Sequence, residues 1–176
     1  MNYPSFGEDL EFSKDPSLAE IMDTYYREFF SAYGGVIEVE HVEDIQEQRK
    51  GYDKVVKLET DQFFRIEEKF DRKIAKTGNF FIETWSDLNK KKGWIYTSRS
   101  DYIAYHNVGL GITYMLPTPT LRRAWKENEA VWRDSYREVF VPNDGWTSMG
   151  LLVPIQVLRE AMITAMIHNH EDRWNF

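Results

Sequence analysis

The sequence predicts a single α/β domain, and three observations lead to this fold class. The chain of 176 residues has the length of one ordinary domain and can bury a core. Its composition is globular, with 42% hydrophobic and 15% aromatic residues, whereas a disordered chain is poor in both. Strand-like and helix-like segments alternate without an internal repeat or a dividing linker. We therefore treat residues 1–176 as one domain, with residues 1–15 as an irregular polar lead-in.

The first part of the chain predicts a helix followed by strands. Apolar residues fall at helical spacing from Leu18 to about Tyr33, and the pair Gly34-Gly35 ends this helix. The segment Val36–His41 alternates Val or Ile with Glu, which is typical of a strand or an extended edge segment. The polar run 43–50 predicts a turn or a short helical piece. Two strands joined by a hairpin turn are expected next, at 53–60 and 62–70.

The remainder of the chain predicts further strands and two more helices. A polar, lysine-rich loop is expected at 86–93, and Pro117 and Pro119 precede a helix. The apolar stripe of that helix is assigned to the core because helical spacing explains it fully. The expected strands are 79–85, 101–106, 111–116 and 146–153, and the expected helices are 120–139 and 154–168.

Charge is unevenly distributed along the sequence. The formal net charge of −7 by itself disfavours a nucleic-acid partner, because phosphate binding usually requires a basic surface. Between Lys69 and Arg99, however, eight basic and three acidic residues give a net charge of +5, so the rest of the chain carries −12. This basic stretch permits a polyanionic substrate at one face. On charge alone, a solvated loop around Lys90-Lys91-Lys92 is an equally good explanation.

The composition also excludes several kinds of site. The chain has no cysteine, which rules out disulfides, thiolate metal sites and cysteine nucleophiles. No apolar run approaches the roughly 18 residues that a membrane helix needs. The acidic N-terminus lacks the basic and apolar regions of a signal peptide. We therefore expect a cytoplasmic protein that does not interact with a membrane.

The most informative pattern is an acid that opens one expected strand and an acid-x-base triplet on the next. Side chains alternate faces along a strand, so Glu67 and Lys69 share one face, about 7 Å apart, and Glu68 takes the other. A hairpin partner that begins at Asp53 can bring a second carboxylate beside them. Two facing carboxylates favour a hard divalent cation such as Mg²⁺. Together with a lysine ammonium, these groups suffice for phosphodiester hydrolysis.

Spacing alone does not establish a site. An Asp followed 14 residues later by Glu-x-Lys is common in charged chains and can mark a surface hairpin with salt-bridging charges. The apolar neighbours of the triplet favour a site, because an isolated buried carboxylate is unfavourable unless it is paired, protonated or metal-bound. Glu83 lies in another apolar strand and is a third acid, a lysine partner or a structural salt bridge. Gln48 orients the attacking water, contacts phosphate or is a plain turn residue.

The order of these motifs resembles that of PD-(D/E)xK nucleases. The segment Gln48-x-x-Gly51-Tyr52-Asp53, followed by Ile66-Glu67-Glu68-Lys69, is similar to their central region, in which a Gly-x-Asp strand precedes an acid-x-Lys strand. Later motifs look like those of a group of bacterial and phage proteins, and the resemblance spans roughly residues 20 to 160. One departure from the pattern is that no proline precedes Asp53.

The resemblance implies a restriction-endonuclease-like fold, in which a mixed central sheet is flanked by helices and residues 53–105 form the core sheet. It also implies that Asp53 and Glu67 are metal ligands and that Lys69 is the catalytic lysine. We expect cleavage of DNA rather than RNA, dependent on Mg²⁺ or Mn²⁺, and a homodimer is one possible assembly. The alternatives are an inactive member of the same fold that binds a protein or nucleic acid, and a phage or mobile-element protein that inhibits a host enzyme by mimicking nucleic acid.

Overall fold

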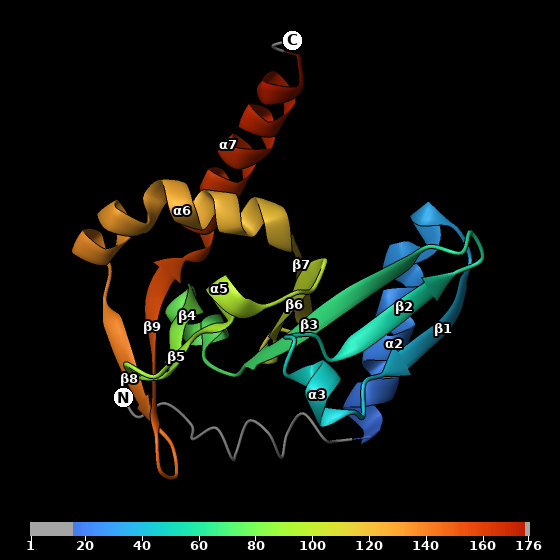
Figure 1. Cartoon of the computed structure of the whole chain (residues 1–176), viewed down its shortest axis with the longest axis horizontal. Helices are drawn as coiled ribbons and strands as arrows, with labels where there is room; N and C mark the ends of the chain where they lie inside the picture. Colours follow the sequence, from blue (N-terminus) through green and yellow to red (C-terminus); the bar gives the residue numbers. More distant parts are fainter. Residues whose placement is uncertain (1–15, 175–176) are drawn as a thin grey trace.

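The computed structural model describes residues 16–174 and contains two β-sheets with helices packed beside them (Figure 1). The lead-in expected at residues 1–15 lies outside this range. The helices are α2 (Pro16–Phe30), the 3-10 helix η1 (Ser31–Tyr33), α3 (Ile45–Gln48), α4 (Ile74–Thr77), α5 (Trp94–Thr97), α6 (Thr118–Ser135) and α7 (Ile155–Trp174). The strands are β1 (Val36–His41), β2 (Lys54–Leu58), β3 (Phe63–Asp71), β4 (Asn79–Asp87), β5 (Lys91–Lys92), β6 (Tyr102–Asn107), β7 (Ile112–Pro117), β8 (Glu138–Pro142) and β9 (Thr147–Pro154).

The first sheet is mixed and has the strand order β1-β2-β3-β6-β7. Strands β3 and β6 run parallel, and the other neighbours are antiparallel. A parallel pair needs a long crossover connection. Between β3 and β6 the chain forms β4 and β5, which are strands of the second sheet. The second sheet has the order β5-β4-β9-β8 and is antiparallel throughout. The expected α/β fold with a mixed sheet flanked by helices is thus confirmed.

Two parts of the sequence-based assignment are wrong. Residues 79–85 were expected in the same core sheet as residues 53–70, but β4 belongs to the second sheet, where it pairs with β9. The helix expected to reach residue 139 ends at Ser135, and Tyr136 already has extended backbone angles. The next residues form β8, in which Val139 is buried and pairs with Gly150 of β9. At β4, pairing with the distant strand β9 decides the structure, and at β8, pairing with the next strand of the chain does.

Helix α2 covers one face of the mixed sheet. Its buried residues Met22, Tyr26 and Phe30 recur every four positions and therefore form one stripe along the helix. This stripe packs against alternate residues of β2, such as Val56 and Leu58, and against buried positions of β3 and β6. The face of β3 that carries Glu67 and Lys69 is therefore the one turned away from α2.

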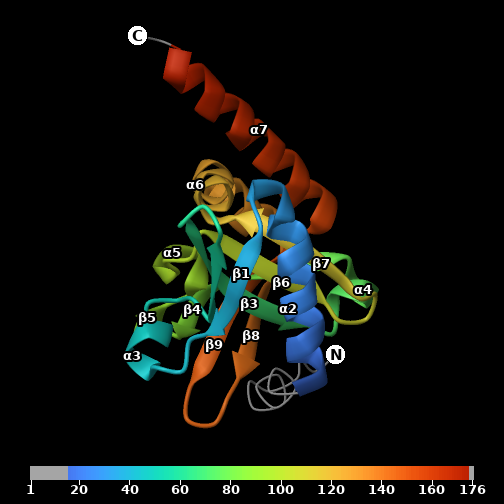
Figure 2. The same ribbon diagram turned by 90° about the vertical axis from the view of Figure 1, so that its right-hand side faces the viewer.

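A second and larger core joins the antiparallel sheet to α6 and α7. Alternate residues of β4, such as Phe80 and Ile82, point into this core, which leaves Phe81 and Glu83 on the opposite face of the strand. The later part of α7 extends away from the sheets (Figure 2). Within residues 16–174, no helix is long and apolar enough to cross a membrane.

Candidate active site

A cavity of about 1040 Å³ is lined by strands of both sheets, and all five residues predicted from the sequence line it. The mixed sheet contributes parts of β1, β3 and β6, and the antiparallel sheet contributes parts of β4, β5, β8 and β9. The α3 region forms a further part of the wall. The predicted residues that line the cavity are Gln48, Asp53, Glu67, Lys69 and Glu83.

Asp53 is positioned by the pairing of β2 with β3. It immediately precedes β2, and its N–H donates to the carbonyl of Ile66 at 2.7 Å. Its Oδ2 accepts a hydrogen bond of 2.8 Å from the N–H of Glu68. The carboxylate therefore lies against the middle of β3, as the hairpin predicted. Burial raises the pKa of Asp53, and the nearby Lys69 ammonium only partly opposes this effect.

Glu67 and Lys69 form the centre of the site. Lys69 Nζ lies 2.5 Å from Glu67 Oε1, as expected for residues two apart on one strand face. The Glu67 side chain is only 7% exposed, and its Oε2 has no hydrogen-bond partner within residues 16–174. Burial alone lowers the pKa of Lys69, but the carboxylates of Glu67, Asp53 and Glu83 outweigh it and raise that pKa. Lys69 is thus a protonated cation among three carboxylates.

Gly51 lies directly over the unpartnered oxygen. Its backbone has a φ of +80°, which favours glycine. A Cβ at this position would lie 3.3 Å from Glu67 Oε2 and 2.7 Å from the Cα of Ser98. The tight turn before Asp53 therefore requires glycine for its conformation and for its close approach to Ser98.

Glu83 reaches the same site from the other sheet. Its Oε1 accepts a hydrogen bond of 3.3 Å from the N–H of Trp94. Burial raises the pKa of Glu83, whereas the Lys69 ammonium lowers it. Glu83 is therefore close enough to Lys69 for their charges to interact, although β4 and β3 belong to different sheets.

Gln48 lies at the edge of the cavity and has a structural contact. Its Nε2 donates to the carbonyl of Val42 at 2.6 Å and so ties the end of α3 to the end of β1. This side chain is exposed, and its predicted contact with water or phosphate stays a prediction.

Buried hydroxyl groups that the sequence did not single out hold the turn at Gly51. Ser98 Oγ donates to the carbonyl of Gly51 at 2.8 Å and lies 2.8 Å from Ser100 Oγ. Ser100 Oγ in turn lies 3.1 Å from Thr118 Oγ1 at the start of α6. Arg122 Nε donates to the carbonyl of Ile95 at 2.9 Å, and its Nη2 donates to the carbonyl of Ser98. These side chains come from segments that are distant in sequence, so their role at the Gly51 turn becomes visible only in the folded structure.

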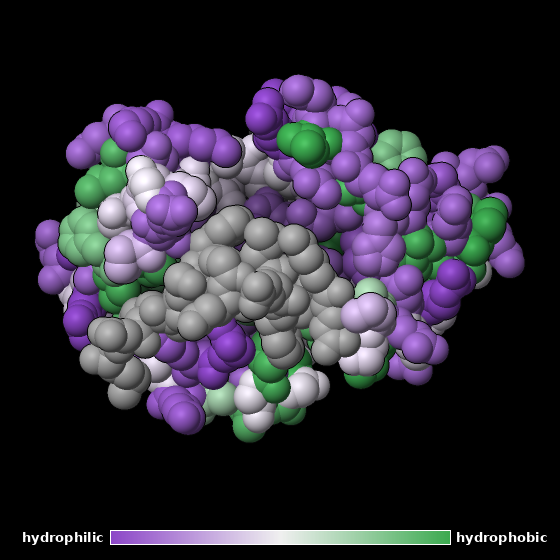
Figure 3. All heavy atoms as spheres, turned by 90° about the horizontal axis from the view of Figure 1, so that it is seen from below, coloured by the Kyte–Doolittle hydropathy of each residue, from purple (hydrophilic) through white to green (hydrophobic). Residues whose placement is uncertain are grey.

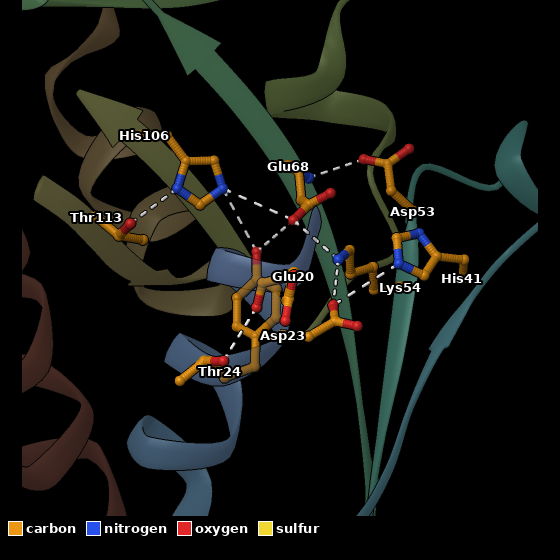
Figure 4. Close-up of polar contacts among 10 residues, drawn as sticks. Glu20, Asp23, Thr24, His41, Asp53, Lys54, Glu68, His106 and Thr113 are labelled. Atoms are coloured by element: carbon orange, nitrogen blue, oxygen red, sulfur yellow. Dashed lines mark hydrogen bonds and ion pairs between the residues drawn. The ribbon is translucent and has the colours of Figure 1, made fainter. Parts of the chain in front are cut away.

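Glu68 points to the reverse face of β3, where it joins a polar cluster (Figure 4). Its Oε1 accepts a 2.7 Å hydrogen bond from the Tyr26 hydroxyl and lies 3.8 Å from both Lys54 Nζ and His106 Nε2. The Lys54 side chain is only 1% exposed and lies 2.6 Å from Asp23 Oδ1. Burial alone raises the pKa of Glu68, but its bonded neighbours outweigh it and lower that pKa. Glu67 therefore shares one face of β3 with Lys69, whereas Glu68, which also lines part of the cavity, points toward α2.

Two cationic side chains lie at the cavity without an ion pair in the described part of the chain. Arg49 immediately follows α3, and Lys91 belongs to β5, so the two come from different segments of the chain. Both residues are exposed. The side of the molecule that carries α3 and the β8–β9 hairpin is mainly hydrophilic where described residues are in view (Figure 3). These surroundings are suited to a charged ligand.

The carboxylates fit the requirements of a hard divalent cation. Mg²⁺ is commonly held by one or two carboxylates, with water and substrate phosphates completing its shell. Asp53 and Glu67 supply two carboxylates, and Glu67 Oε2 is a buried acceptor without a partner among residues 16–174. Among the side chains of residues 16–167, no group of three or more His, Asp or Glu is arranged to hold a metal ion. A metal would thus depend on these two carboxylates and on oxygens from outside the protein.

Comparison with known proteins identifies no relative: no family model, no curated protein and no solved structure matches this chain. The function must therefore be inferred from the geometry of the cavity and its side chains.

Proposed function

We propose that this protein is a metal-dependent nuclease that hydrolyses phosphodiester bonds of DNA and has a restriction-endonuclease-like core. The observation that carries the proposal is the environment of Glu67. One of its oxygens contacts Lys69, and the other is buried beside the cavity without a partner in the described residues. Leaving a buried acceptor unsatisfied costs roughly 1–3 kcal/mol, and more for a charged group. A ligand that binds this oxygen would remove that cost.

In this proposal Asp53 and Glu67 hold Mg²⁺ or Mn²⁺, which would lower the pKa of a water and neutralise charge on the phosphoryl group. Lys69 donates hydrogen bonds to the phosphate oxygens, where negative charge grows in the transition state. Because its pKa is raised, Lys69 serves as a donor and not as a general base. Glu83 holds the ammonium in place from the opposite sheet.

Cleavage assays with the purified full-length chain test this proposal. Single- and double-stranded DNA and RNA are incubated with Mg²⁺, Mn²⁺ or Ca²⁺, and the products are separated by size. Lys69→Ala is expected to lose roughly a hundredfold or more in rate, as other enzymes do when one transition-state donor is removed. Lys126→Ala, which removes an exposed lysine of α6 outside the cavity, serves as the matched control. No cleavage by the wild type, or equal rates for both variants, would reject catalysis.

An inactive nuclease-like protein of phage or mobile-element origin, which binds or inhibits a partner, is the alternative. A protein that mimics nucleic acid should carry its acids in rows on an outer face, whereas Asp53, Glu67 and Glu83 line one cavity. Calorimetric titration with Mg²⁺ separates the two functions. Uptake that disappears in Asp53→Asn supports the nuclease, and no uptake by the wild type supports the alternative. We place the activity in the cytoplasm, with a monomer or homodimer as the active species.

A further inference from the structure

The depth of the candidate site restricts the form of its substrate. The Glu67 side chain is almost fully buried, and the strands β3 and β4 that border the cavity belong to different sheets. A volume of about 1040 Å³ is close to the upper end of the range for pockets that enclose a drug-sized ligand. Such a space accommodates a few nucleotides. A B-form duplex is stiff, and its scissile phosphate would have to reach the buried carboxylates from the rim.

An aromatic side chain lies beside the reactive groups. Phe81 lines the cavity on the same face of β4 as Glu83, two positions away. Its ring occupies the space above Gly150 of β9, where a Cβ would approach the ring to 2.5 Å. The backbone N–H of Phe81 also donates to the hydroxyl of Tyr105 at 3.0 Å, and this hydroxyl donates to Asp71 Oδ2 at 2.7 Å. These contacts across the two sheets fix an apolar ring at the site.

Two exposed cationic side chains line the same cavity. Arg49 immediately follows α3 and Lys91 belongs to β5, and neither forms an ion pair with a side chain of residues 16–167. Proteins that bind single strands combine such cations, which contact the backbone phosphates, with aromatic rings on which unpaired bases stack. A duplex offers no unstacked base to a ring at this depth.

We propose that the cavity binds unpaired nucleotides of a single DNA strand, with phosphates at Arg49 and Lys91 and a base stacked on Phe81. This inference rests on the proposed nuclease function, because it assigns the substrate of the same site. It predicts that the protein acts on single strands, flaps or unpaired ends in preference to continuous duplex.

Fluorescence anisotropy with labelled oligodeoxynucleotides tests the inference. Lys69→Ala is titrated in Ca²⁺ against a 12-nucleotide single strand and against the blunt duplex of the same sequence, at several salt concentrations. The single strand is expected to bind at least about tenfold more tightly. On the Lys69→Ala background, Phe81→Leu keeps an apolar side chain over Gly150 and should weaken single-strand binding by roughly 5- to 150-fold, the loss of one stacked base. Phe81→Tyr should retain the affinity.

Matched controls separate the site from general surface effects. Phe140→Ala removes an exposed ring of β8 that does not line the cavity and should leave binding unchanged. Arg49→Ala and Lys91→Ala should each reduce the dependence of log affinity on log salt by about 1, whereas Lys126→Ala should not. Circular dichroism melting confirms that each variant is folded.

The possible failures are distinguishable. Duplex binding as tight as single-strand binding, or an unchanged affinity in Phe81→Leu, overturns the single-strand inference and leaves the nuclease proposal standing. If the protein binds neither form and the wild type cleaves neither, the proposed function itself fails and this inference fails with it.

Discussion

The two faces of β3 bury neighbouring glutamates in opposite ways. On the reverse face, Glu68 contacts the Tyr26 hydroxyl and lies near Lys54 and His106, so its charge is compensated. On the cavity face, Glu67 shares one oxygen with Lys69, and the other has no partner among residues 16–174. A carboxylate buried with its partners stabilises a fold, whereas one buried with a vacant acceptor is suited to a ligand.

Proton binding distinguishes the two faces as well. Burial raises the pKa of Asp53 and Glu83 on the cavity side, so their ionised forms reduce the stability of the folded protein as the pH rises above the ordinary carboxyl range. The pKa of Glu68 is lowered because its bonded neighbours outweigh the opposing effect of burial. This group therefore adds stability at neutral pH, which is lost as the pH falls through the carboxyl range. Stability and site chemistry thus occupy opposite sides of one strand.

The largest effect is expected on the reverse face. Lys54→Ala leaves both Asp23 and Glu68 without the buried cation that they share and should lower the free energy of unfolding by about 3–5 kcal/mol. The double variant Lys54→Met/Glu68→Leu also removes the buried carboxylate and leaves only the more exposed Asp23 without this lysine, so its loss should be smaller. Urea unfolding measures both. Equal losses in the single and double variants would show that packing, and not charge compensation, dominates on this face.

On the cavity face, Gly51→Ala is expected to cost about 1–3 kcal/mol from the positive φ alone and more from the collision with Ser98. Gly145→Ala is the matched control, since its φ is +84° and a Cβ there meets no atom within 4 Å. Urea unfolding of the two variants separates backbone strain from contact. A loss at Gly51 no greater than at Gly145 would refute the close packing over Glu67.

A smaller effect of opposite sign is expected from Asp53→Asn. Removing a carboxylate whose ionised form is disfavoured by burial should stabilise the protein at pH 7, and its Tm should rise. The same variant should not cleave DNA, and thermal melting beside an activity assay would reveal the trade-off. Destabilisation by this substitution would mean that Asp53 is structural.

The smallest expected effect is a shift in pH dependence. Both Asp53 and Glu67 must be ionised to act as ligands, so activity should fall as the pH decreases. Because the pKa of Asp53 is raised by burial, the acid limb of kcat/KM should lie above 3.8, its ordinary value. A profile measured in buffers of constant ionic strength tests this expectation. An acid limb at or below 3.8 would contradict the burial of Asp53.

The sequence predicts those parts of the molecule that depend on local periodicity. Alternation along β3 correctly separates Glu67 and Lys69 from Glu68, and the hairpin brings Asp53 to the same strand. Local periodicity cannot show which sheet a strand joins, and for this reason β4 was assigned to the wrong one. The same limit applies to β8, whose pairing with β9 interrupts an apparently continuous helical pattern.

The contacts that hold the site were also beyond the reach of sequence analysis. Ser98 carries no motif, and the partners of Ser98 and Arg122 are backbone carbonyls of segments that only folding brings together. Glu83 was identified as a candidate because an acid in an apolar strand is unusual. Its approach to Lys69 from a second sheet could not be predicted, because it depends on how two layers of the fold meet.

The division of the site between two sheets would make the proposed activity a measure of cooperative structure. Glu83 and Phe81 reach the cavity from the antiparallel sheet, and Glu67 and Lys69 reach it from the mixed one. Partial opening between the sheets would preserve the strands and most of the far-ultraviolet dichroism, yet would separate these side chains. Mild denaturant should therefore abolish turnover before secondary structure melts, so turnover reports on the docking of the two sheets.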